Sequence, residues 1–335
     1  MIDIAEVASL LGPASSGELE AMALRSHRAT LAHFGRTIRF FAPLYLSNEC
    51  ITTCTYCGFA ATNETIVRRT LGPAEAMAEA AELTSRGFRH LLLVSGEHPR
   101  IVNRDYLAGV VETLAPTVPS LSIETQVWDT PTYRRLHEAG CEGVVVYQET
   151  YDETTYRAVH LKGRKRNYGW RREAPERAAE AGMRRLGIGV LLGLAPDWRA
   201  DVLALVAHAR ELQRVAWRCE ITVSLPRLRP CAGGIVPQSV VSDRDFVQLV
   251  CALRLALPEV GIVMSTREAP RLRDHLVRIG VTHMSAGSHT EPGGYLRPGE
   301  AEPQFDIEDD RPVEAVAASV RSAGYEVVWK DWVRS

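Results

Sequence analysis

Three cysteines stand close together in the first fifth of the chain at the spacing C-x3-C-x2-C. They are Cys50, Cys54 and Cys57, and an aromatic residue, Tyr56, comes directly before the third. Three thiolates cannot saturate a metal centre that takes four sulfur ligands. A [4Fe–4S] cluster held by three cysteines keeps one iron free to bind another molecule. The spacing therefore predicts an iron–sulfur cluster whose open iron is the reactive centre.

Zinc is the alternative metal that these cysteines could bind. A structural zinc site is normally closed by a fourth Cys or His, and after Cys57 the next such residue is His90, although a more distant ligand such as His98 could fold in. A group of three cysteines is poorly suited to disulfides. We expect the other cysteines to be buried small side chains: Cys141, Cys219, Cys231 and Cys251.

The composition describes a globular chain without a strong charge bias. It has 335 residues, of which 46% are hydrophobic and 24% charged, and a formal net charge of −2. This length suffices for one barrel-sized domain or two smaller ones. The near-neutral charge gives no reason to expect nucleic acid or an anionic membrane as a partner. Without a signal peptide pattern or a membrane-length apolar run, and with few cysteines outside the motif, we expect a cytoplasmic protein.

The segments that must position the cysteines alternate between short apolar runs and helix-length stretches. We predict strands at eight runs: 39–46, 90–95, 121–127, 143–148, 185–194, 220–225, 261–265 and 281–285. Such alternation gives β-α-β units with a parallel sheet, and strands this apolar are buried on both faces. We therefore predict an α/β fold of the (β/α)8 TIM-barrel type.

The two ends of the chain are expected to add to this barrel. Residues 1–37 have a helical pattern and are predicted to form an N-terminal helical cap on one barrel end, before a single barrel domain over 38–335. The stretch 312–323 is predicted as the last helix, and 325–332 as a short tail strand. A doubly wound sheet is disfavoured because no glycine-rich phosphate loop joins a strand to a helix.

Polar residues gather where the predicted strands end, which is where barrels of this type carry their active sites. The cysteines follow the first strand, and Gly96 and Glu97 follow the second. Later strand ends carry further polar residues: Glu124, Gln126, Tyr147, Gln148, Glu149, Ser224, Arg227, Arg229, Arg267, Glu268, Ser285 and Ser288. So many polar groups around an apolar core would be costly without ligands. Arg267 is the first choice for a substrate carboxylate, because a guanidinium can bind both oxygens.

Each of these residues also has a structural interpretation. Glu97 could cap the next helix, Glu149 could pair with a surface lysine such as Lys162, and Arg267 could pair with Glu268 or Asp274. Any one of these residues could have a purely structural role, but so many polar residues at the strand ends together favour a ligand-binding site.

The cysteine motif resembles that of the radical S-adenosylmethionine (SAM) enzymes. Longer segments resemble the 2-iminoacetate synthases, the ThiH family of tyrosine lyases: PLYLSNEC, CTYCGF, HLLLVSGEH, VVVYQETY, HLKGRK, GIGVLLGL, SLPRLRPC, STREAP and WKDW. The resemblance implies a lyase that cleaves the Cα–Cβ bond of L-tyrosine to 2-iminoacetate and p-cresol, with 5′-deoxyadenosine and methionine as the other products. In that family the 2-iminoacetate supplies the thiazole moiety of thiamine.

The same resemblance implies roles for individual residues. The three cysteines would bind the [4Fe–4S] cluster, and its open iron would bind SAM. Gly96 and Glu97 would meet the ammonium group of SAM, Glu149 its ribose or methionyl group, and Arg171 its carboxylate. Arg267 would hold the carboxylate of the substrate amino acid, with Ser285 or Ser288 as a helper.

Partners and rivals follow from the resemblance as well. It implies a reduced flavodoxin- or ferredoxin-type electron donor and a thiazole synthase that receives the fragile 2-iminoacetate. The nearest rival is a lyase of the same architecture that acts on L-tryptophan, and a rival of another class is a non-catalytic zinc-binding protein. Recognition of the phenol stays open between Tyr147, His98, Gln126 and Ser224.

Overall fold

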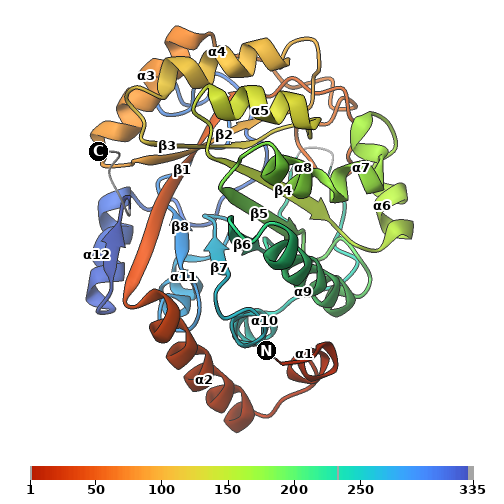
Figure 1. Cartoon of the computed structure of the whole chain (residues 1–335), viewed down its shortest axis with the longest axis vertical. Coiled ribbons are helices and arrows are strands. Elements are labelled where there is room, and N and C mark those ends of the chain that lie inside the picture. The colour runs from red at the N-terminus through yellow and green to blue at the C-terminus, as the bar shows by residue number, and fades with distance from the viewer. Residues whose placement is uncertain (1, 232–233, 331–335) are drawn as a thin grey trace.

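A closed parallel barrel forms the centre of the molecule in the computed structural model, which describes residues 2–231 and 234–330 (Figure 1). Neighbouring strands pair in chain order, and β1 pairs with both β8 and β2, which closes the barrel. The predicted (β/α)8 fold is confirmed. The eight strands are β1 Thr37–Ser47, β2 His90–Ser95, β3 Ser120–Glu124, β4 Gly143–Glu149, β5 Arg185–Val190, β6 Glu220–Ser224, β7 Gly261–Met264 and β8 His283–Ser285.

Helices surround the barrel and connect its strands. Several begin at a side chain that accepts a hydrogen bond from the first helical turn, as Asn103, Asp129 and Asp197 do. In the described residues no helix is long and apolar enough to cross a membrane. The connecting helices are α3 Pro73–Ser85, α4 Arg104–Leu114, α5 Thr130–Glu138, α6 Glu153–Val159, η1 Arg164–Arg166, α7 Tyr168–Arg172, α8 Ala174–Glu180, α9 Trp198–Val215, α10 Asp243–Ala256, α11 Pro270–Leu276 and α12 Val313–Ser322.

Two strands end three or four residues earlier than their apolar sequence predicts. The third run was extended to residue 127, but β3 ends at Glu124, and the indole nitrogen of Trp128 donates to the Thr125 hydroxyl in the loop. The fifth run was extended to residue 194, but β5 ends at Val190. There the chain turns through Gly193, whose φ is +98°. Apolar residues beyond both strands stay buried under loops, so hydrophobicity alone could not mark the strand ends.

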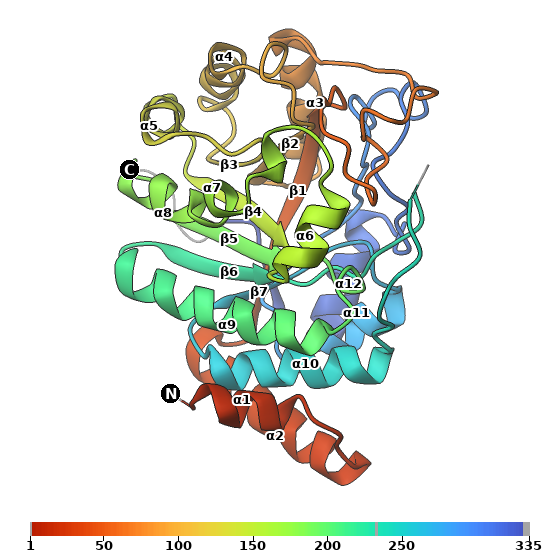
Figure 2. The ribbon, with the colours of Figure 1, turned by 90° about the vertical axis from the view of Figure 1, so that its right-hand side faces the viewer.

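The amino-terminal segment forms two helices, α1 Ile4–Leu10 and α2 Ser16–Phe34. They pack along the outside of α10 and α9 and form a further layer on that side of the helix ring (Figure 2). The Gln248 amide donates to the carbonyls of Leu10 and Gly12, which fixes this layer to α10. The boundary between a cap (1–37) and a barrel domain (38–335) remains our proposal, and β1 itself begins at Thr37.

A ninth strand, β9 Glu326–Val328, pairs in parallel with the first residues of β1, Thr37 to Arg39. Trp329 follows it and packs edge-on against Phe40 and Phe88, with 5.4 Å between ring centroids in each pair. A tail strand is confirmed over 326–328, but residues 325, 329 and 330 of the predicted range are not part of it, and 331–332 lie outside the described residues.

A cavity of about 80 Å3 lies inside the barrel at the amino ends of the strands. The Glu220 carboxylate accepts a hydrogen bond from Arg39 there and lies 3.3 Å from the Arg185 Nε and 3.6 Å from the His283 Nε2. A set of four residues lines both this lower cavity and a larger one at the opposite end: Phe41, Leu92, Tyr147 and Val263.

Candidate active site

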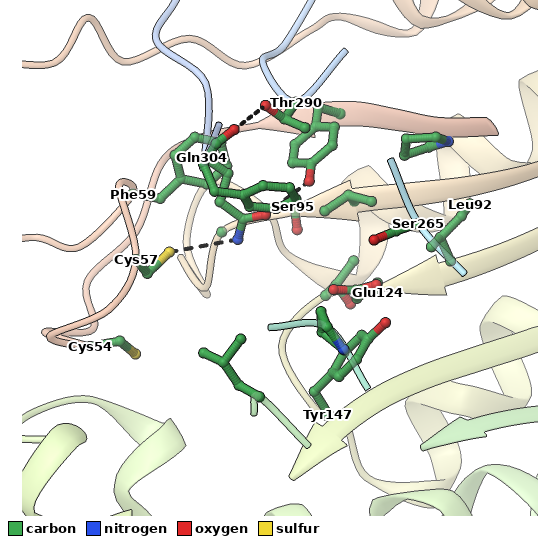
Figure 3. A pocket seen from close by; sticks show the side chains of 18 of the residues that line it. Cys54, Cys57, Phe59, Leu92, Ser95, Glu124, Tyr147, Ser265, Thr290 and Gln304 are labelled. Carbon is green, nitrogen blue, oxygen red and sulfur yellow. Dashed lines mark hydrogen bonds between the residues drawn. The ribbon is translucent and has the colours of Figure 1, made fainter. Parts of the chain in front are cut away.

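The larger cavity lies at the carboxyl ends of the strands and has a volume of about 160 Å3. All ten residues predicted for the site line it, although they come from parts of the chain more than 230 residues apart. Cys54 and Cys57 stand on one side, and Glu124, Tyr147 and Ser265 lie further along the cavity (Figure 3). The ten are Cys50, Cys54, Cys57, Gly96, Glu97, Glu149, Arg171, Arg267, Ser285 and Ser288.

The cysteine segment, residues 46–59, leaves the end of β1 and forms one wall of the cavity. The Thr52 hydroxyl lies 3.0 Å from the Cys50 sulfur and 3.5 Å from the Cys54 sulfur. Within residues 2–231 and 234–330, no three His, Cys, Asp or Glu side chains are arranged to hold a single metal ion. Cysteines that bind different irons of one cluster need not converge on a point.

The turn after β2 packs directly on the cysteine segment. The Gly96 amide donates to the Ser47 carbonyl, and the Ile51 amide donates to the Glu97 carbonyl, both at 2.9 Å. A Cβ atom at position 96 would lie 2.4 Å from the Glu49 carbonyl oxygen, so only glycine allows this approach. The neighbouring Ser95 hydroxyl is buried without a hydrogen-bond partner among the described residues, and it is therefore available to a ligand.

Four charged side chains form a network on the next wall. The Arg171 guanidinium donates to the Glu97 carboxylate at 3.1 Å and lies 4.0 Å from Glu149. The Lys165 ammonium donates to Glu149 at 2.7 Å. Burial alone would raise the pKa of Glu149, but the charges of Lys165 and Arg171 outweigh it and hold that pKa below its ordinary value. The network thus pairs two basic side chains with two acidic ones.

Glu149 also has an unusual backbone conformation. Its φ is +71°, and it is the only non-glycine residue with positive φ in the described parts of the chain. The pairing of β4 with β5 shifts register at this point. Such strain persists where the surrounding structure fixes it, and it is common at functional sites. The sequence suggested pairing with the exposed Lys162, but the partner is Lys165, which lines the cavity.

Arg267 presents an unpaired cation to the cavity. Its guanidinium carbon lies 3.3 Å from the centroid of the Phe305 ring. In the part of the chain that the structure describes, this guanidinium makes no hydrogen bond or ion pair, and Glu268 pairs instead with Arg227. Ser288 lines the same cavity with a buried hydroxyl that has no partner there, and Ser285 lines it too. The suggested pairing of Arg267 with Glu268 or Asp274 is therefore wrong, and Asp274 pairs with Arg311.

Glu124, at the end of β3, is the functional candidate that the sequence did not assign to a ligand. Its side chain is half-buried and lines the cavity, and its carboxylate has no hydrogen bond or ion pair with another described residue. Burial, and then the charge of Glu149, raises the pKa of Glu124 to about 7, while Arg267 opposes the shift. Of the four residues considered for the phenol, Tyr147 lines this cavity, Ser224 lines the lower one, and His98 and Gln126 line neither.

Comparisons with known proteins identify the family of this chain. The family model described as the radical SAM superfamily matches residues 44–206, and the Biotin and Thiamin Synthesis associated domain matches residues 224–326. The chain is 45% identical to the 2-iminoacetate synthase of Escherichia coli and 42% identical to that of Salmonella typhimurium. Each alignment covers 98% of this chain and 86% of the relative.

Solved structures show the same architecture. HydG, a maturase of the [FeFe]-hydrogenase, superposes with a TM-score of 0.93 at 33% identity, over 98% of this chain and 73% of that one. Methylornithine synthase (PylB), with a TM-score of 0.79 at 20% identity over 98% of this chain and 94% of its own, shares the fold. This chain therefore belongs to the 2-iminoacetate synthase family of radical SAM enzymes.

Proposed function

We propose that this protein cleaves the Cα–Cβ bond of L-tyrosine to 2-iminoacetate and p-cresol, with 5′-deoxyadenosine and methionine as the other products. The observation that carries this proposal is the pair Arg267 and Glu124, both without partners among the described residues, in the cavity that also holds the three cysteines. A free amino acid offers one carboxylate and one ammonium group. An unpaired guanidinium and an unpaired carboxylate in one cavity match those two groups.

The residues of the cysteine wall and of the charged network fit the two cofactors that the family implies. Three thiols in one cavity wall suit a [4Fe–4S] cluster, and we assign SAM to Gly96, Glu97, Glu149 and Arg171. The close approach at Gly96 and the unpartnered Ser95 hydroxyl support this assignment. When bound, the two cofactors would supply a 5′-deoxyadenosyl radical that takes a hydrogen atom from the substrate amino group.

The protein's own groups would position the amino acid and prepare its amino group. Arg267 can donate two parallel hydrogen bonds to the carboxylate, and Phe305 behind it restricts the guanidinium to one plane. Ser288 or Ser285 would donate to the same carboxylate. With a pKa of about 7, the Glu124 carboxylate can accept the ammonium proton and leave a neutral amino group for hydrogen-atom abstraction. Held in this way, the substrate loses little further freedom on reaction.

We also infer what the enzyme exchanges with other proteins. The imine of 2-iminoacetate reacts readily with water, so transfer to a thiazole synthase, for the thiazole moiety of thiamine, would protect it. A reduced flavodoxin- or ferredoxin-type protein would deliver the electron, and both partners place the enzyme in the cytoplasm. The match to the Biotin and Thiamin Synthesis associated domain supports this assignment.

The test is anaerobic incubation of the iron-loaded protein with SAM, a reductant and either tyrosine or tryptophan, followed by mass spectrometry. We expect p-cresol and glyoxylate, the hydrolysis product of 2-iminoacetate, from tyrosine alone. Tryptophan consumption without p-cresol from tyrosine would assign the rival substrate. Iron and zinc are measured separately on the protein as purified anaerobically, before any iron is added, since one zinc per chain without iron would exclude the radical reaction. A Cys57→Ala variant is the control and should yield no product.

A further inference from the structure

The segment 302–309, here called the strap, has no regular secondary structure, and its residues Gln304 and Phe305 line the upper cavity. At one end the Gly58 amide in the cysteine segment donates to the Gln304 carbonyl at 3.2 Å. At the other end the amides of Glu308 and Asp309 donate to the Thr266 carbonyl beside Arg267. A Cβ atom at position 58 would lie 2.7 Å from the Gln304 carbonyl oxygen, so the glycine after the third cysteine lets the strap approach.

Gln304 reaches from this strap to a cysteine sulfur. Its Nε2 donates to the Cys57 Sγ at 3.6 Å (Figure 3). Its Oε1 accepts from the Tyr45 hydroxyl at 2.8 Å. Burial, and then the charge of Glu124, raises the pKa of Tyr45 well above its ordinary value, so this hydroxyl keeps its proton and can donate. A metal-bound thiolate only accepts hydrogen bonds. Both neighbours therefore require the same amide orientation, with oxygen toward Tyr45 and nitrogen toward Cys57.

We propose that Gln304, oriented by Tyr45, raises the reduction potential of the cluster. The inference rests on the proposed assignment of Cys57 as a cluster ligand. Reduction adds negative charge to the cluster and its thiolates, and an N–H donor to a thiolate stabilises that added charge. Gln304 acts through Cys57 and is a positioning residue.

The setting favours a functional amide over one that only fills space. Thr52 lies beside the Cys50 and Cys54 sulfurs from within the cysteine segment, whereas the donor to Cys57 stands 247 residues later in the chain. Tyr45 is 5% exposed, packs edge-on against Phe59 and lines the cavity, so the orienting hydroxyl is held on β1. A strand residue and a strap residue are thus both needed to present one N–H group to one sulfur.

The experiment is an anaerobic potentiometric titration of the cluster-loaded protein, read from the electron paramagnetic resonance of the reduced cluster, without SAM or tyrosine. Two variants test the donor and its orientation: Gln304→Leu removes the amide, and Tyr45→Phe keeps the ring but removes the hydroxyl. Pro303→Ala is the control, because Pro303 is the exposed strap residue beside Gln304.

For Gln304→Leu we expect the equilibrium constant for reduction to fall at least about threefold, which is about 28 mV at 59 mV per tenfold change. Tyr45→Phe should shift the potential in the same direction by less, and Pro303→Ala should leave it unchanged. A Gln304→Leu potential equal to or above that of the wild type would overturn the inference. If the Gln304→Leu variant loads less iron than the wild type, the Tyr45→Phe variant becomes the deciding test. An unchanged reduction potential in Tyr45→Phe would then also overturn the inference. Since no tyrosine is present, these outcomes are independent of the substrate assignment.

Discussion

Replacing Glu124 by Gln gives the sharpest test of the substrate site, because it should stabilise the protein and impair the enzyme. The pKa of Glu124 is raised from 4.5 to about 7 in the folded protein. The folded state therefore holds this proton more tightly than the unfolded state does, and ionisation of Glu124 costs stability as the pH rises through this interval. Above about pH 7 the cost is complete.

The size of the effect follows from the shift. Each pKa unit corresponds to about 1.4 kcal/mol, so the shift sets an upper limit of about 3 kcal/mol. Glu124 borders a cavity that water can enter, which reduces this limit, and we expect a gain of about 1 to 3 kcal/mol for Glu124→Gln near pH 8. Near pH 4, where the carboxyl is protonated in both states, the gain should vanish.

Activity should change in the opposite direction. For a carboxylate of pKa about 7, the ionised fraction rises about tenfold between pH 6 and pH 8, so p-cresol formation by the wild type should rise with it at limiting tyrosine. The glutamine variant cannot accept the ammonium proton. It should lose this dependence and turn over about 100-fold or more slowly.

Two measurements on the same preparations check this reasoning: urea unfolding at two pH values, and p-cresol formation as a function of pH. Glu138→Gln is the matched control, because Glu138 is exposed on α5 and outside the cavity. A variant that is no more stable than the wild type near pH 8 would refute the buried, unpaired carboxylate. A variant that keeps the wild-type pH dependence would refute its role as proton acceptor.

Three further variants test other walls of the cavity. Arg267→Lys loses the planar fork and should raise the KM for tyrosine about 10- to 100-fold in steady-state assays, and an unchanged KM would exclude Arg267 as the carboxylate ligand. Gly96→Ala places a Cβ atom 2.4 Å from the Glu49 carbonyl, so iron content after reconstitution should fall, and full loading would contradict the close approach. Lys165→Met removes the nearest cation from buried Glu149 and should cost about 3 kcal/mol in urea unfolding. Lys162→Met, at an exposed position, should change stability little and is its control.

The barrel and the position of the cysteine segment were predictable because their signals are local. An apolar run followed by a helix-length stretch specifies a parallel strand wherever it occurs, and eight such runs close into a barrel. Once the strands were placed, nine of the ten predicted site residues followed as polar or glycine positions near strand ends, but the resemblance was needed to select them. Arg171 lies on α7 and entered through the resemblance alone. The errors at the ends of β3 and β5 arose because apolar residues such as Trp128 stay buried after the strand has ended.

What the sequence could not give depends on contacts between distant segments. Lys165 lies within η1 and reaches Glu149, whereas Lys162 lies just before η1 and is exposed. The sequence alone does not distinguish these two lysines. Gln304 carries no signal at all, because its role follows from the approach of the strap to Gly58. The positive φ of Glu149 could not be predicted either, because glutamate rarely adopts a left-handed backbone conformation.

The two charged walls of the cavity differ in whether their side chains have ionic partners. On one wall, each charged side chain already has an ionic partner before a ligand binds, in the pairs Lys165–Glu149 and Arg171–Glu97. Arg267 and Glu124 have no such partners among the described residues, and holding them near a low-dielectric barrel core destabilises the empty protein. By the proposed assignment, binding of a zwitterion would relieve this cost on both residues at once, whereas a ligand that carries only one of the two charges would leave the other residue without a partner. We therefore propose that the part of the cavity that is least stable when empty selects for a free amino acid.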